Sequence, residues 1–205
     1  MLICIEGIDG SGKSTLAQRL KLFLQQNGNT VLLTKEPGGS ALGKQLRSIL
    51  QTQPMPISPI SEFLLFAADR AQHVQEVIKP AIAQSTIVIT DRMGDSSLVY
   101  QRYGRGIDKQ MITKVNEWAL QGITPDLTLY VKIDGTTAAQ RVHKRGELSA
   151  FEKEQADFVD RLISGFNELY HDRVDVITLD GTQSPDDIIL TAGKAVSQWM
   201  NQHRP

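Results

Sequence analysis

The chain has 205 residues, of which 40% are hydrophobic and 22% charged, so it can form a substantial core, and its 16 Gly and 8 Pro residues are too few for a collagenous or low-complexity protein. Its 22 Lys and Arg residues balance 23 Asp and Glu residues, and the net charge of -1 excludes an overall basic field for nucleic acid or an anionic membrane. Cys4 is the only cysteine, and no apolar run is long enough to span a bilayer. These features predict a cytoplasmic protein that binds neither nucleic acid nor membrane.

Five short apolar runs, rich in β-branched residues, are the candidate strands of the chain. Their hydrophobic residues are continuous rather than alternating, which is typical of parallel strands that helices cover on both faces. The runs are Leu2–Ile5, Val31–Thr34, Thr86–Thr90, Leu127–Ile133 and Val174–Leu179.

Helical periodicities separate these strands. Apolar residues recur three or four positions apart in three groups: Leu16, Leu20, Phe23 and Leu24; Leu42, Leu46, Ile49 and Leu50; and Phe158, Leu162, Phe166 and Leu169. Ser58-Pro59 and Ser184-Pro185 are typical helix starts, whereas Asn27-Gly28 and Gly122 are typical helix ends. Because strands and helices alternate, the sequence predicts an α/β fold, a doubly wound parallel sheet of five strands, in one domain over residues 1–205.

A complete phosphate-binding motif, G-x-x-x-x-G-K-[ST], follows the first candidate strand and opens a helix. Its glycines let backbone N–H groups point at phosphate oxygens, Lys13 can reach the β- and γ-phosphates, and Ser14 can bind Mg²⁺. An ordinary glycine-rich turn would not require the full motif. We therefore predict that a nucleoside triphosphate binds to Gly7, Ile8, Asp9, Gly10, Ser11, Gly12, Lys13, Ser14 and Thr15.

The third candidate strand is followed by Asp91 and Arg92. A carboxylate at the end of an apolar strand has the form of a Walker B element, whose Asp orients Mg²⁺. An Asp at this position is also a common turn residue, so the signal is weak alone. Ligands bind at the carboxyl edge of open parallel sheets, however, which favours metal binding by Asp91.

Other polar and aromatic residues predict a second binding site near the first. Phe66 and Arg70 lie four residues apart on one predicted helix and can present a flat apolar surface and a guanidinium to a base. Taken alone, such a pair is more commonly a core Phe and a surface Arg. The remaining candidates follow the second and third strands, and they are Pro37, Arg47, Ser97, Tyr100 and Gln101.

Positive charge gathers between Arg141 and Arg145. In isolation this cluster is most simply a solvated helix end. The phosphate-binding loop contains no arginine, however, and a movable arginine that neutralises the transition state accelerates phosphoryl transfer. We therefore expect this segment to supply that charge.

Seven segments occur in a characteristic order and spacing: IEGIDGSGKST (5–15), KEPGGS (35–40), FAADR (66–70), DR (91–92) with Ser97 and Tyr100-Gln101, GRGID (104–108), PDLTLY (125–130) and RGEL (145–148). In these segments, from Leu2 to about Thr182, the chain resembles the thymidylate kinase family of nucleoside monophosphate kinases. The resemblance implies phosphorylation of dTMP to dTDP by ATP with Mg²⁺. It also implies a homodimer, with a mobile lid at about residues 141–152.

The resemblance assigns roles to individual residues. Phe66 would stack on thymine, Arg70 would bond the base edge, and Tyr100 would exclude a ribose 2′-hydroxyl. The catalytic residues would be Asp9, Lys13, Arg92, Arg141 and Arg145. ATP would contact the phosphate-binding loop, Arg141 and Thr182, and Mg²⁺ would contact Ser14 and Asp91. The dTMP site would comprise Asp9, Pro37, Arg47, Phe66, Arg70, Arg92, Ser97, Tyr100 and Gln101.

Two departures from the family pattern bear on this reading. Relatives without an arginine in the phosphate-binding loop often read RGELDR in the lid, whereas this chain ends that segment with Ala150. Met93 stands where relatives commonly have an aromatic or imidazole ring. The alternatives are a P-loop kinase for another nucleoside monophosphate or a nucleoside, and a nucleotide-binding regulator without turnover, which only the missing arginine favours.

Overall fold

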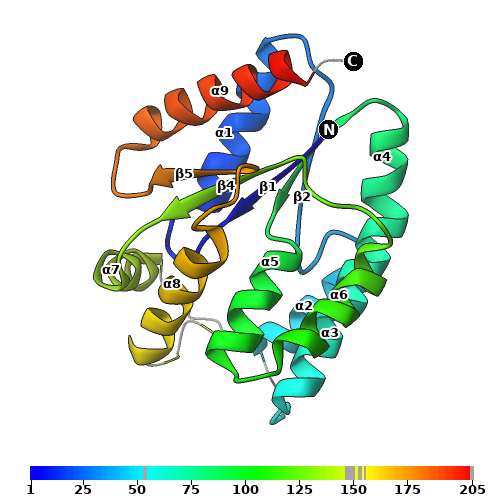
Figure 1. Ribbon diagram of the computed structural model, residues 1–205, viewed down its shortest axis with the longest axis vertical. Helices are drawn as coiled ribbons and strands as arrows, with labels where there is room; N and C mark the ends of the chain where they lie inside the picture. The colour runs from blue at the N-terminus through cyan, green and yellow to red at the C-terminus, as the bar shows by residue number, and fades with distance from the viewer. Residues whose placement is uncertain (53–54, 146–150, 152–153, 155, 204–205) are drawn as a thin grey trace.

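A computed structural model describes residues 1–52, 55–145, 151, 154 and 156–203 (Figure 1). Its centre is a parallel sheet in the order β2-β3-β1-β4-β5. The strands are Leu2–Glu6 (β1), Val31–Lys35 (β2), Ile87–Asp91 (β3), Leu127–Lys132 (β4) and Val176–Asp180 (β5). The predicted fold class is confirmed, and the ends of each predicted strand agree with the observed ones to within two residues.

Helices cover both faces of this sheet. α1 (Lys13–Gln26) and α9 (Pro185–Gln202) pack together on one face, and the π-helical segment η1 (Val74–Ile78) with α4 (Lys79–Ala83) lies on the other (Figure 1). Ile3 and Ile5 enter the first core, whereas Leu2 and Cys4 enter the second. Burial of both faces is the reason that the strands are continuously apolar.

The remaining helices surround the carboxyl edge of the sheet. They are α2 (Ala41–Thr52), α3 (Pro59–His73), α5 (Gly94–Ser97), the π-helical η2 (Leu98–Gly104), α6 (Lys109–Leu120), α7 (Gly135–Arg145) and α8 (Ala156–Tyr170). The Oγ of Ser58 accepts from the N–H of Ser61, and Ser184 caps α9 through Asp187 in the same way. Both predicted helix starts are therefore confirmed, as are the helix ends before Asn27 and Gly122.

One apolar face is not covered by the described chain. Leu42 and Ile49 of α2, which share a predicted apolar face with the buried Leu50, are 42% and 41% exposed. Ile60 and Leu64 of the adjacent α3 are 49% and 47% exposed. We call these four residues the α2/α3 apolar face.

Strand pairing decides which loops meet. β1 and β3 are neighbours, and Ile5 pairs with Asp91. The loop after β1 therefore lies beside the residues that follow β3, although more than eighty residues separate them in the chain.

No helix among the described residues is long and apolar enough to cross a bilayer.

Candidate active site

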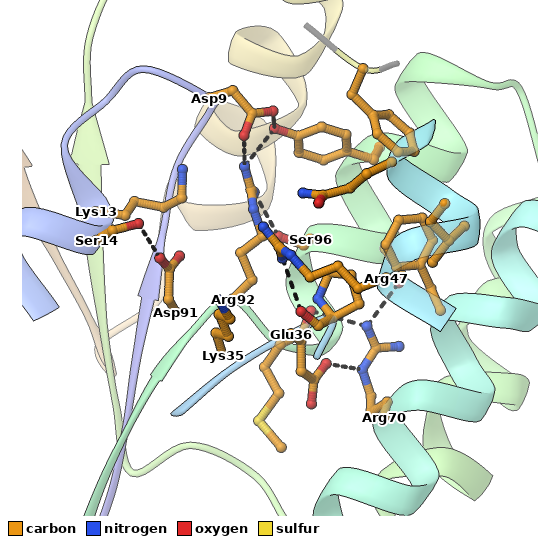
Figure 2. Close-up of a pocket in the computed structure, with 18 of the residues that line it drawn as sticks. Asp9, Lys13, Ser14, Lys35, Glu36, Arg47, Arg70, Asp91, Arg92 and Ser96 are labelled. Atoms are coloured by element: carbon orange, nitrogen blue, oxygen red, sulfur yellow. Dashed lines mark hydrogen bonds and ion pairs between the residues drawn. The ribbon is translucent and has the colours of Figure 1, made fainter. Parts of the chain in front are cut away.

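A cavity of about 790 Å³ opens at the carboxyl ends of the strands (Figure 2). It brings together most of the predicted site residues. Those that line it are Asp9, Gly10, Gly12, Lys13, Ser14, Thr15, Pro37, Arg47, Phe66, Arg70, Asp91, Arg92, Ser97, Tyr100, Gln101 and Arg141. The candidate nucleotide and acceptor residues thus share one cleft.

The loop between β1 and α1 forms the phosphate end of the cleft. Gly7 has a φ of +145°, and a Cβ there would lie 2.6 Å from the carbonyl oxygen of Val131, so only glycine fits. Lys13 is buried, and its Nζ donates to the carbonyl oxygen of Ile8 at 2.7 Å. Burial, and then the charge of Arg92, lower the pKa of Lys13 to about 8.

A candidate Mg²⁺ site lies where this loop meets β3. The Oγ of Ser14 donates to Oδ2 of Asp91 at 2.6 Å (Figure 2). The described residues contain no group of three or more His, Cys, Asp and Glu side chains arranged to hold a metal. One hydroxyl and one carboxylate fit Mg²⁺ that takes its other oxygens from water and phosphates, because this ion rarely relies on an all-protein cage.

Arg92 occupies the middle of the cleft in a strained backbone conformation, with a φ of +75°. Its Nη2 donates to Oδ1 of Asp9 at 2.8 Å and to the hydroxyl of Tyr100 at 2.9 Å. The Tyr100 hydroxyl in turn donates to Oδ2 of Asp9 at 2.9 Å. Burial opposes ionisation of Asp9, but the charges of Arg92 and Lys13 hold the pKa of Asp9 well below its usual range. Asp9 is therefore an anion at neutral pH.

Glu6 supports Arg92 from below the cleft. This fully buried carboxylate accepts from the N–H of Met93 at 2.9 Å and from the Oγ of Ser96 at 2.6 Å. Ser96 also accepts from Nη1 of Arg92 at 3.0 Å. Burial raises the pKa of Glu6 to about 7, against the charge of Arg92. These bonds fix the turn that carries the strained Arg92.

Arg70 forms the base end of the cleft, which we define by Phe66, Arg70, Ser97 and Gln101. Its Nε donates to Oε2 of Glu36 at 2.9 Å (Figure 2), and its Nη2 donates to the Oγ of Ser97 at 3.0 Å. A third bond, at 2.6 Å, runs from its Nη1 to the side chain of Asn116. Arg70 is only 2% exposed, so it is not the surface arginine of the alternative interpretation. It is a held donor, a buried hydrogen-bond donor whose position its partners fix.

The other predicted acceptor residues lie around this end. Nη1 of Arg47 donates to the carbonyl oxygen of Pro37 at 2.9 Å, and the peptide bond before Pro37 is cis. The ring of Phe66 lies 5.8 Å from that of Phe151, which also lines the cavity. Sequence patterns gave no reason to select Phe151.

A second cavity, of about 240 Å³, lies between the phosphate-binding loop and the start of α9. Nη1 of Arg141 donates to the carbonyl oxygen of Gly181 at 2.8 Å, and Arg141 lines both cavities. Ser11 and Gln183 line the second cavity. Thr182 is not among its lining residues, and its backbone N–H and Oγ1 both donate to Oδ1 of Asp180.

Part of the predicted lid lies outside the described residues. This holds for residues 146–150 and 152, which include Ala150, and for the side chain of Arg145. The role expected for Arg145 therefore stays a prediction.

A family model described as thymidylate kinase matches residues 5–189. The chain belongs to the thymidylate kinase family. It is therefore a kinase, and the regulator reading is set aside.

Individual relatives agree with this membership. The thymidylate kinase of Maridesulfovibrio salexigens is 41% identical over 199 residues, which cover 92% of this chain and 91% of that protein. The thymidylate kinase of Nitratidesulfovibrio vulgaris is 42% identical over 200 residues, covering 92% and 88%. A crystal structure of the Ehrlichia chaffeensis thymidylate kinase matches with a TM-score of 0.78 and 32% identity, covering 96% of this chain and 98% of that one.

Several side chains that shape this thymidylate kinase cleft escaped sequence reasoning. Glu36 lies inside the KEPGGS segment, and Glu6 ends the first apolar strand just before the phosphate-binding motif. The position of each residue in the sequence was therefore a weak indication that it belongs to the site. Asn116 carried none, because an Asn on a predicted helix is usually a solvent-facing residue. Its contact with Arg70 spans 46 residues.

Asp69, next to Arg70 on α3, leads to a prediction about stability. Its Oδ1 accepts from the N–H of Gly38 at 2.9 Å, whereas its buried Oδ2 has no hydrogen-bond partner among the described residues. Burial, and then the charge of Glu36, raise the pKa of Asp69 to about 6. Because this folded-state pKa exceeds the unfolded value, the contribution of Asp69 to stability is complete below about pH 4 and is lost as the pH rises through 6.

Asp69→Asn removes this titration. We expect the free energy of unfolding of Asp69→Asn, minus that of the parent, to be about 1 kcal/mol larger at pH 8 than at pH 5, since one pKa unit corresponds to 1.36 kcal/mol and only the parent loses stability as this carboxyl ionises. Urea unfolding of both proteins at the two pH values measures the difference. An equal difference at both values would mean that Asp69 keeps one protonation state throughout.

Proposed function

We propose that the described cleft is where this kinase carries out the reaction of its family, the ATP-dependent phosphorylation of dTMP to dTDP. The observation that carries the proposal is the order of groups along a single cavity. The phosphate-binding loop lies at one end, the held donor Arg70 lies at the other, and Arg92 lies between them. That order suits a donor phosphate chain, an acceptor phosphate and an acceptor base.

The donor half is built to hold a triphosphate. Backbone N–H groups of the loop and the N-terminus of α1 would bind the β- and γ-phosphates, and Lys13 would leave the Ile8 carbonyl oxygen to reach them. Arg141, which lines both cavities, would cover the base side of ATP. Ser14 and Asp91 would hold Mg²⁺, which, when bound, supplies neutralising charge to the phosphates.

In the acceptor half, Arg92 would bind the dTMP phosphate and Asp9 would accept a bond from the sugar. Arg92 is already oriented by Asp9, Tyr100 and Ser96, so little ordering is needed on binding. Asp9, held as an anion, is an acceptor and not a proton donor. The Tyr100 ring would occupy the space of a ribose 2′-hydroxyl, which favours a deoxynucleotide.

The chemistry of Arg70 supports thymine over cytosine. A guanidinium only donates hydrogen bonds, and Glu36, Asn116, Ser97 and the Met93 carbonyl oxygen occupy four of its five N–H groups. The remaining N–H requires an acceptor on the base edge. Thymine and uracil offer a carbonyl oxygen there, whereas cytosine offers an amino group.

Arg145 is our candidate for the movable arginine, within one kinase unit whose lid spans about residues 141–152. Phosphoryl transfer requires positioning and charge neutralisation more than a strong base. The loop between β1 and α1 contains no arginine, so the last residue of α7, Arg145, would supply this charge.

Purified protein with ATP and Mg²⁺ tests the function directly. ADP formation is followed against dTMP, dUMP, UMP, dCMP, AMP and GMP, with Lys13→Ala as the control for contaminating kinases. We expect strong stimulation by dTMP. Stimulation by another monophosphate alone would overturn the acceptor assignment, and stimulation by none would overturn the function.

The α2/α3 apolar face leads us to propose that the protein is a homodimer through this surface. Four exposed apolar side chains on two packed helices favour a protein interface.

We also place the protein in the cytoplasm. Its single cysteine, Cys4, is a buried free thiol, which suits a reducing compartment.

Leu64→Arg tests this surface. We expect light scattering after size exclusion to give a dimer mass for the parent and a monomer mass for Leu64→Arg, because a buried unpaired charge costs several kcal/mol. Leu190→Arg is the matched control, since Leu190 is 60% exposed on α9, across the sheet (Figure 1). A monomeric parent, or a Leu64→Arg dimer, would contradict the proposal.

A further inference from the structure

Arg105, the residue after η2, joins separate parts of the chain beside the base end of the cleft. Its Nε and Nη2 donate to the two carboxylate oxygens of Glu62 in α3, each at 3.2 Å. Its Nη1 donates to Oε1 of Glu154, beyond α7, at 2.5 Å. Glu62 is only 2% exposed, and a two-pronged pair with a planar guanidinium fixes both partners.

Two neighbours of Arg105, Glu62 and Phe151, connect it to the base end of the cleft. Oε1 of Glu62 also accepts from Nε2 of Gln101 at 3.1 Å, which sets the direction of that amide. On the other side, the Arg105 guanidinium carbon lies 5.6 Å from the ring centre of Phe151, within the range of a cation–π contact. Phe151 faces Phe66, and both rings line the cavity.

Arg105 does not itself line the cavity. A second ring, Phe158 of α8, lies 5.1 Å from the same guanidinium carbon, so the side chain, 20% exposed, contacts two carboxylates and two rings. An arginine with these neighbours has little freedom to move. Arg105 therefore restrains Gln101 through the carboxylate of Glu62, and it restrains the Phe151 ring by direct contact.

We infer that Arg105 is a positioning residue for the acceptor base, which keeps the Gln101 amide and the Phe151 ring in place around thymine. The inference rests on the proposed function, because it names residues that shape the dTMP site of that reaction. It adds a charged connection between α3 and the segment after α7. Arg105 should therefore affect recognition of dTMP and leave recognition of ATP unchanged.

Arg105→Lys is the main test, because Lys keeps a charge beside the buried Glu62 but cannot bond both of its oxygens. We expect KM for dTMP to rise about tenfold, as for the loss of one charge-assisted hydrogen bond, with KM for ATP and kcat within twofold. Titration calorimetry of dTMP alone should show the same weakening. Glu154→Gln, which alters only the outer contact, should give a smaller change in the same direction.

Arg102→Ala is the matched control. Arg102 lies three residues earlier, contacts the Tyr103 ring and lies 3.7 Å from Glu168, and it does not line the cavity. Its KM for dTMP should equal that of the parent.

A double variant separates positioning from general stability. Because Arg105 acts partly through Phe151, the loss of dTMP affinity in the double variant Arg105→Lys/Phe151→Ala should be smaller than the product of the two single losses. A parent-like KM for dTMP in Arg105→Lys would overturn the inference, as would equal rises in the KM values of dTMP and ATP with a lowered Tm. If the parent itself neither binds nor phosphorylates dTMP, the proposed function fails first, and the inference fails with it.

Discussion

Arg92→Ala is expected to lower kcat/KM for dTMP by about a thousandfold, because hydrogen bonds to charged groups contribute about 1.5–3 kcal/mol each and two would be lost from the acceptor phosphate. In the middle of the cleft, Nη1 of Arg92 donates to Ser96 and to the carbonyl oxygen of Gly7, and Nη2 donates to Asp9 and Tyr100. The guanidinium is therefore preorganised for an anion. KM for ATP should change little, since Arg92 belongs to the acceptor half of the site.

Arg92→Lys separates charge from geometry. It keeps one positive charge in the cleft but cannot present two parallel N–H groups, so we expect most of the activity to be lost, about a hundredfold. Arg161→Ala is the control, because Arg161 is an exposed arginine on α8. Steady-state rates at varied dTMP and saturating ATP measure the effect. Activity of Arg92→Ala within tenfold of the parent would remove Arg92 from the acceptor site.

Arg145→Ala is expected to lower kcat by about a thousandfold with little change in either KM, which is the lower end of the effect of an arginine that acts in the transition state. Such a residue binds the migrating phosphoryl group more strongly than the ground-state nucleotides, so its loss appears in kcat. Single-turnover measurements with saturating ATP and dTMP isolate this step.

Arg141→Ala provides the contrast within the same helix. Nη1 of Arg141 lies 2.8 Å from the Gly181 carbonyl oxygen, at the wall between the two cavities. We expect its loss chiefly to raise KM for ATP. Lys144→Ala, an exposed neighbour, should match the parent. If Arg145→Ala keeps kcat within a few-fold and Arg141→Ala does not, the roles of these arginines are reversed.

Local sequence was sufficient for the phosphate-binding loop and for the strands. The motif around Lys13 needs only glycines at fixed spacing between a strand and a helix, and these are properties of adjacent residues. The continuous apolar runs also predicted the class of sheet, because strands covered on both faces have no polar side. The neighbours Asp91 and Ser14 could be expected at one edge, since parallel strands bring their carboxyl ends together.

The α2 helix shows where periodicity stopped being informative. Leu42 and Ile49 share an apolar stripe with Leu50, but only Leu50 is buried. A stripe indicates that a face will be covered and does not identify the covering element. The described chain leaves this face open, which is why we assign it to a second copy.

The sequence by itself therefore determined the fold class, the phosphate site and the family, because each depends on residues close together in the chain or on a pattern shared with relatives. Only the tertiary structure decided which buried groups hold the functional side chains. Glu6 beneath Arg92 and Asn116 beside Arg70 act across long stretches of chain. Arg105 between Glu62 and Glu154 is of the same kind. Such contacts arise from the packing of distant elements, and local patterns of hydrophobicity or charge do not specify them.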